Sequence, residues 1–202
     1  MAAAVIPLRS ATALRLAVAL GTAAWSAVPA LAQELPPPAY QIAAAQSGVP
    51  SSVLYAVALQ ESGTRLRGRL IPWPWTLNVA GASQRHATRR EACLALHRAL
   101  GYTPAERIDV GLGQINVGYH AQRVQHPCAL LDPYRNLGIA AEILHEQHRP
   151  GEEWIAAVGR YHRPAGGPPA ARYRGAVQRH LMRVMGSPQA LASSKPLREN
   201  TP

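Results

Sequence analysis

The chain has 202 residues, 48% of them hydrophobic, and a formal net charge of +10 at pH 7. This excess of basic residues narrows the expected partners to nucleic acid, anionic lipid or an acidic polymer such as cell wall, with a solvated basic surface as the alternative. The length after the first 32 residues is enough for one domain with a real core, and no stretch there is long and apolar enough to cross a bilayer.

Residues 1–32 have the pattern of a secretory signal peptide. Arg9 and Arg15 supply the positive start, residues 16–24 supply the apolar centre, and Ala-Leu-Ala at 30–32 forms a small-residue cleavage site. An uncleaved anchor is the alternative, but the apolar run is short for a bilayer span and is interrupted. We therefore expect an exported protein without a stable membrane span after cleavage, which argues against nucleic acid as its partner.

An apolar helix that ends in an acidic residue is the most informative segment. Residues 39–47 predict a first short helix, and residues 51–60 predict a second one that is apolar on nearly every face. Glu61 follows at its end, and Gly63 is the expected stop. The negative end of the helix dipole and apolar surroundings both raise the pKa of a carboxyl group. Glu61 is therefore a candidate general acid near neutral pH, with a solvated Glu on a surface helix as the alternative.

The segment that follows lacks helical periodicity. Residues 65–82 contain β-branched and aromatic residues, and Pro72 and Pro74 interrupt them. This composition predicts a short irregular hairpin or an extended loop, and not a central strand.

Helices are predicted for most of the remaining chain. Thr88 and Glu91 form a capping box, and Asp132 is a typical N-cap residue. The helices expected in this part cover residues 89–100, 119–124, 133–149, 152–161 and 168–185. Residues 187–202 are polar and Pro-containing, as is typical of a disordered tail. The sum is one mainly α domain, residues 33–186, with six to eight short helices.

The two cysteines, Cys93 and Cys128, are expected to form a disulfide, because an exported protein meets an oxidising compartment. Closing this loop stabilises a fold by about 3 kcal/mol in the chain-entropy model. Two buried free thiols are the alternative. Neither cysteine has the close Cys or His partners of a structural zinc site, and the histidines of His-Glu-Gln-His at 145–148 are three residues apart where a zinc motif has four. We expect no metal and no cofactor.

Four short segments follow one another in a specific order. They are Glu61-Ser62, Gly-Leu-Gly-Gln-Ile-Asn at 111–116, residues 136–144, and Ala-Val-Gly-Arg-Tyr at 157–161. Together they resemble the soluble lytic transglycosylase (SLT) family, enzymes that cleave bacterial peptidoglycan, and above all its small periplasmic members that accompany type IV secretion and conjugative-transfer systems. The resemblance implies a periplasmic protein and a mainly α, goose-type lysozyme-like helical domain with a short irregular hairpin or loop insertion.

The resemblance assigns roles residue by residue. Glu61 would be the catalytic acid and base, with the hydroxyl of Tyr161 near its carboxyl group. Ser62 would neighbour it in the cleft, and Gln114 and Asn116 would face the sugar through amide groups that both donate and accept hydrogen bonds. The implied partners are peptidoglycan glycan strands and components of a secretion or conjugation apparatus.

Other positions near these motifs are less decided. Trp73 and Trp75 are candidates for stacking on sugar rings, with packing in the core as an equal alternative. Gly113 stands where the family often has Met, and this change is expected to loosen the turn. His162 and Arg163 stand where the family often has Asn and Ala.

The implied reaction needs one carboxyl group, whereas glycoside hydrolases usually pair two. Glu61 would protonate the oxygen between N-acetylmuramic acid and N-acetylglucosamine, and then accept the proton of the muramic C6 hydroxyl as a 1,6-anhydro sugar forms. Two rivals stay open: a muramidase that uses Asp109 as its second carboxylate, and a non-catalytic wall-binding or assembly protein. A nucleic-acid-binding module built on the Arg-rich residues 172–183 is a third, which the signal peptide argues against.

Overall fold

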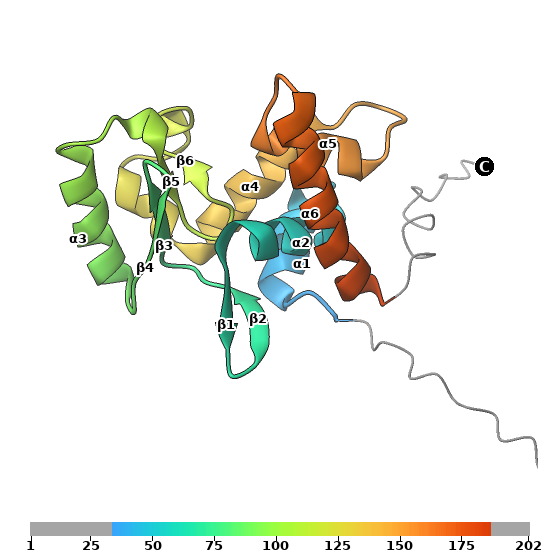
Figure 1. Cartoon of the computed structure of the whole chain (residues 1–202), viewed down its shortest axis with the longest axis horizontal. Coiled ribbons are helices and arrows are strands. Elements are labelled where there is room, and N and C mark those ends of the chain that lie inside the picture. Colours follow the sequence, from blue (N-terminus) through green and yellow to red (C-terminus); the bar gives the residue numbers. More distant parts are fainter. Residues whose placement is uncertain (1–33, 187–202) are drawn as a thin grey trace, which may run out of the picture.

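The computed structural model describes residues 34–186, and the predicted signal peptide (1–32) and tail (187–202) lie outside this part. Six α-helices, six short strands and three 3₁₀ helices make up the described chain (Figure 1). The α-helices are α1 (Pro38–Gln46), α2 (Ser51–Ser62), α3 (Arg89–Leu100), α4 (Pro133–Gln147), α5 (Trp154–His162) and α6 (Gly167–Met185). The strands are β1 (Gly63–Leu66), β2 (Arg69–Pro72), β3 (Thr76–Val79), β4 (Ala82–Arg85), β5 (Ile108–Val110) and β6 (Ile115–Asn116), and the 3₁₀ helices are η1 (Ala105–Arg107), η2 (Ala121–Arg123) and η3 (Pro127–Leu131).

The expected fold class, a mainly α lysozyme-like helical domain with an irregular hairpin or loop insertion, is wrong. The described residues form a mixed α and β structure in which six strands build two antiparallel sheets. Each strand has only two to four residues, too few for an alternating pattern to be read. The β1-β2 and β3-β4 hairpin turns also lack the usual Asn-Gly or Asp-Gly signal: Arg67 and Ala80 take the positive φ angles of 49° and 53° there, each before a glycine.

The segment predicted not to be a central strand contains one. Sheet order β4-β3-β5-β6 places β3 between two antiparallel neighbours. Pro72 ends β2 and Pro74 follows it, so both precede Thr76, where β3 starts, and neither proline removes an N–H group from the ladders of β3. Thr76 and Leu77 are fully buried, which explains why this short strand forms at the centre of the sheet.

Helix α2 is the centre of the helical part of the molecule. All seven residues from 53 to 59 are buried, as its apolar composition predicts. Helices α6 and α4 both contact it, and α5 packs on α6 (Figure 1). The backbone leaves the helix at Gly63, with ψ of 132°, and only glycine fits there because a Cβ would lie 2.2 Å from the carbonyl oxygen of Leu59.

Local capping signals act as the sequence predicts. The backbone N–H of Glu91 donates to the hydroxyl of Thr88 at the start of α3, and the N–H of Arg135 donates to Asp132 Oδ1 at the start of α4.

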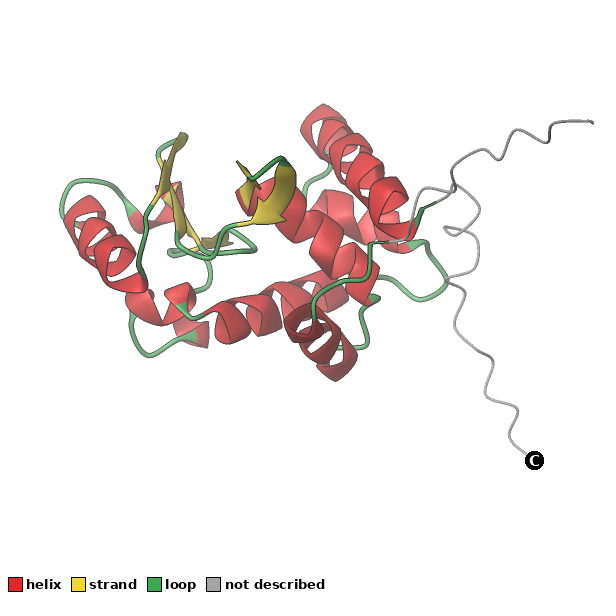
Figure 2. Cartoon of the chain, turned by 90° about the horizontal axis from the view of Figure 1, so that it is seen from below, coloured by secondary structure: helices red, strands yellow, loops and turns green. Residues whose placement is uncertain are grey.

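Helix α4 runs beneath the four-stranded sheet toward α5 (Figure 2). This helix therefore forms a common support for both parts of the fold.

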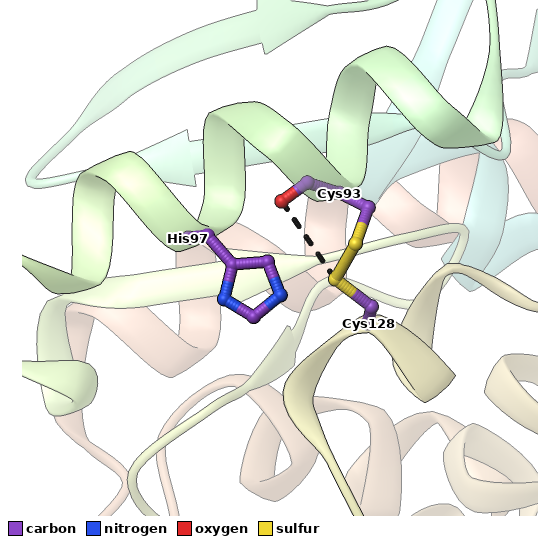
Figure 3. Close-up of side chains that lie close together, drawn as sticks. All are labelled: Cys93, His97 and Cys128. Atoms are coloured by element: carbon purple, nitrogen blue, oxygen red, sulfur yellow. Dashed lines mark hydrogen bonds between the residues drawn. A yellow bond between two sulfur atoms is a disulfide. The ribbon is translucent and has the colours of Figure 1, made fainter.

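The predicted disulfide between Cys93 and Cys128 is confirmed, with Cα atoms 5.3 Å apart. It links α3 to η3 (Figure 3).

Within residues 34–186, no single helix has the length and apolar composition of a membrane span. The pair α1 and α2 reaches that length and composition only when the two helices are counted together, and the pair is bent by 116°.

Candidate active site

A cleft of about 780 Å³ lies between the sheet and the helices α4 and α5. Its lining comes from the end of α2, from β3 to β6, from the last turns of α4 and from α5 with the loop after it. The polar and ionisable residues that line it include Glu61, Asn78, Asp109, Gln114, Asn116, Glu146, Arg160, Tyr161 and His162. Four of the sequence-predicted site residues, Glu61, Gln114, Asn116 and Tyr161, thus share one cleft.

Glu61 lies in the last turn of α2, half-buried, with its carboxyl group at the cleft. Burial raises its pKa from 4.5 to about 7, and the negative charge of Asp109 acts in the same direction. A hydrogen bond from the hydroxyl of Tyr173 to Glu61 Oε1, at 2.5 Å, lowers the pKa in part. The direction agrees with the sequence prediction. A carboxyl group in this state can both donate and accept a proton near neutral pH.

Tyr173, on α6, is the site residue that sequence reasoning missed. It is buried, its hydroxyl donates to Glu61, and its ring stacks on that of His162 with centroids 4.5 Å apart. It shares the buried face of α6 with Ala170, Val177 and Leu181. A tyrosine within such an apolar stripe requires a hydrogen-bond partner for its hydroxyl, and this was the available signal.

Tyr173→Phe is expected to raise the pKa of Glu61 by about one unit, because the lost hydrogen bond stabilises the carboxylate form. A ¹³C NMR titration of the side-chain carboxyl groups measures this change. Tyr161→Phe is the matched control, since its hydroxyl donates to the carbonyl of Gly113 and not to Glu61. An unchanged or lowered pKa in Tyr173→Phe would contradict the role given to this hydroxyl.

Asp109 supplies a second carboxyl group to the cleft. It lies on β5 opposite Asn116 on β6, and Asn116 Nδ2 donates to Asp109 Oδ1 at 2.8 Å. Burial raises the pKa of Asp109, while the amide of Asn116 and the imidazole of His162 lower it. Asn116 also donates to the carbonyl of Glu106, so its amide orients Asp109 and the strand pair.

The turn between β5 and β6 is held by partly buried hydrogen bonds. Tyr161 donates to the carbonyl of Gly113 at 2.6 Å, and Gln114, with φ of 47°, donates to the carbonyl of Gly111 at 2.9 Å. A Cβ at position 113 would lie 2.9 Å from the Tyr161 hydroxyl and 2.8 Å from Ala140 Cβ. A side chain at this position would therefore need space that Tyr161 and Ala140 occupy.

Asn136, on α4, fixes the other side of this turn. It is buried, and its Nδ2 donates to the carbonyls of Val110 and Leu130 at 2.9 and 2.8 Å. Its Oδ1 accepts the backbone N–H of Gly113 at 2.8 Å. This one amide therefore satisfies three buried backbone groups and ties α4 to the sheet.

Three other predicted residues lie outside the lining that the structure describes. Ser62 is fully buried, and its hydroxyl lies 3.0 Å from the carbonyl of Ala58 and 2.9 Å from that of Leu112. It thus joins α2 to the Gly-rich turn. Trp73 and Trp75 pack edge to face, with centroids 5.8 Å apart, and neither is among the residues that line the cleft.

The cleft combines a carboxyl group that titrates near pH 7, a second carboxyl group and several amide groups. Such a set suits acid–base chemistry on a neutral, hydroxyl-rich ligand.

A scan against protein-family models, a search of curated proteins and a search of solved structures each find no match for this chain.

Proposed function

We propose that this protein is an exported peptidoglycan lytic transglycosylase, which cleaves the β-1,4 bond between N-acetylmuramic acid and N-acetylglucosamine. The single observation that supports this most is Glu61, a carboxyl group with a pKa of about 7 beside a polar cleft. A general acid for a glycosidic oxygen must carry its proton near the working pH, and an ordinary exposed Glu does not. The order of the sequence motifs supports the same function.

In the proposed reaction Glu61 first donates its proton to the glycosidic oxygen, and the bond from this oxygen to C1 of the muramic residue breaks. The carboxylate then takes the proton of the C6 hydroxyl of the same residue as its oxygen bonds to C1. The products are a 1,6-anhydromuramic end and a free N-acetylglucosamine end, and no water is consumed. Attack by a hydroxyl of the same sugar gains the advantage of an intramolecular reaction.

A muramidase is the second candidate, and the position of Asp109 favours it. This carboxyl group lines the same cleft as Glu61 and is oriented by Asn116. Hydrolysis by two carboxyl groups would need Asp109 as nucleophile or base, and would release reducing ends. Transglycosylation needs Glu61 alone, so the two functions differ in the role of Asp109.

Mass spectrometry of peptidoglycan digested by the full chain and by Asp109→Asn tests both functions. Anhydromuropeptides from both proteins would support the transglycosylase. Reducing muropeptides from the wild type, lost in Asp109→Asn, would establish the muramidase instead. Binding of peptidoglycan without any cleavage would overturn both in favour of a wall-binding protein.

The pH profile follows from the raised pKa of Glu61. Its acid form is half populated near pH 7, so kcat/KM is expected to fall by about tenfold per pH unit well above that value. The rate of muropeptide release, measured between pH 5 and 9 at constant ionic strength, tests this expectation. An ordinary Glu with a pKa of 4.5 would place the fall near that pH, and such a profile would contradict the proposed acid.

The cellular role proposed here is the local opening of the cell wall in the periplasm, for a secretion or conjugation apparatus. The net charge is +10 for the whole chain and +8 once Arg9 and Arg15 leave with the predicted signal peptide, and such a basic protein suits contact with an acidic wall polymer. Deletion of residues 187–202 with separate assays of wall cleavage and of transfer would test whether this tail connects the enzyme to such an apparatus.

A further inference from the structure

A histidine lies beside the disulfide, which the spacing of the cysteines along the chain did not suggest. Cys93 and His97 are four residues apart on α3 and therefore lie on the same face of the helix. Cys128 reaches this face from η3. The sulfur atoms and an imidazole nitrogen all lie within 4.8 Å of one another (Figure 3). The expectation that neither cysteine has a close His partner is thus wrong, because His97 lies beside both sulfur atoms.

The burial of these side chains leaves the group open on one side. Cys128 is buried, Cys93 is half-buried and His97 is exposed. A small ion or a reductant can therefore approach from the side of His97. Two sulfur atoms and one imidazole form the donor set that Zn²⁺ prefers, and three protein ligands leave the fourth tetrahedral position to a water molecule.

We propose that reduction of the Cys93–Cys128 disulfide converts this group into a binding site for one Zn²⁺, held by both thiolates and by His97. The oxidised pair offers no thiolate, so the covalent and the metal-bound states exclude each other. Each state connects α3 to η3. The metal would therefore maintain the link between these elements when the disulfide is absent, before oxidation or after reduction.

The chemistry balances with a dithiol as the reductant. The dithiol supplies two electrons and two protons, its own disulfide forms as the Cys93–Cys128 bond breaks, and two thiols remain in the protein. Zn²⁺ then displaces both thiol protons and binds the neutral imidazole, so binding weakens as pH falls. Metal binding at this group requires no catalytic function of the cleft.

The test uses the full chain reduced with a water-soluble phosphine, which adds no competing thiol, and Co²⁺ as a spectroscopic probe for the zinc site. We expect one Co²⁺ per chain, with a thiolate-to-cobalt charge-transfer band that Zn²⁺ abolishes. The oxidised protein is expected to show no such band. A reduced protein without the band, or an oxidised protein with it, would overturn the proposal.

His97→Ala separates the three-ligand site from simple metal capture by two thiols. Because losing even an outer-sphere partner costs a zinc site about tenfold in affinity, loss of this ligand is expected to weaken Zn²⁺ binding at least that much. His145→Ala, an exposed histidine on α4, is the matched control and is expected to bind as the wild type does. Equal affinity of His97→Ala and wild type would contradict the site.

Loss of structure on reduction would not prevent the test. If the reduced chain unfolds, circular dichroism with added Zn²⁺ gives the second measurement, because a metal that binds only the native state restores it. Recovery of the helical signal in the wild type, but not in Cys93→Ser, would support the proposal. A reduced chain that stays unfolded with Zn²⁺ would contradict it.

Discussion

Glu61→Gln is expected to lower the rate of peptidoglycan cleavage by about 10²- to 10⁴-fold, the range that general acid catalysis supplies. Gln has nearly the same shape and still accepts the hydrogen bond from Tyr173, but it has no proton to transfer at any working pH. Two assays on the same peptidoglycan preparation, release of soluble muropeptides and binding of the protein, separate a loss of catalysis from a loss of binding. The matched control is Glu153→Gln, the same change at an exposed position outside the cleft lining.

Glu61→Gln is also expected to stabilise the folded protein above pH 7. The folded-state pKa of Glu61 is raised, so its contribution to stability is fully present below about pH 4.5 and is lost as pH rises through about 7. The loss amounts to at most about 3 kcal/mol at higher pH, because one unit of pKa corresponds to about 1.4 kcal/mol. Denaturant unfolding at pH 5 and pH 8 measures it. Two results would contradict the role of this carboxyl group. One is a cleavage rate of Glu61→Gln within tenfold of the wild-type rate, and the other is a lower stability of this variant than of the wild type at pH 8.

Asn136→Ala is expected to destabilise the protein by about 3–5 kcal/mol, because each buried polar group left without a partner costs about 1–3 kcal/mol. The substitution leaves three such groups: the N–H of Gly113 and the carbonyls of Val110 and Leu130. The free energy of unfolding in urea measures the change. Loss of this support also frees the turn that carries Gln114, so cleavage is expected to fall with stability.

Two further variants define the contribution of Asn136. Asn136→Asp keeps an acceptor for the Gly113 N–H but places a carboxylate against two carbonyl oxygens, so it is expected to be destabilised as well. Asn78→Ala is the control, since the Asn78 side chain accepts a hydrogen bond only from the exposed turn at Gly81. A loss below about 1 kcal/mol in Asn136→Ala would show that water or rearrangement replaces the amide.

Part of the site was accessible from the sequence because the relevant interactions are local or follow from an ordered set of motifs. Glu61 stands one turn from buried apolar residues of its own helix, so its dry surroundings could be inferred. Thr88 and Asp132 cap helices through N–H groups only three residues away. Asp109 and Asn116 lie on either side of a Gly-containing turn, and their proximity follows from a short hairpin.

The sequence by itself thus determined that the pKa of Glu61 is raised, where helices begin at capping residues and which cysteines pair. Only the tertiary structure decided which side chains meet at the cleft. Tyr173 reaches Glu61 across 112 residues, while Ser62, next to Glu61 in sequence, turns into the interior toward Leu112. The strands and the approach of Cys128 to His97 were equally hidden, because short strands and packed elements depend on partners distant along the chain, whose placement no local pattern encodes.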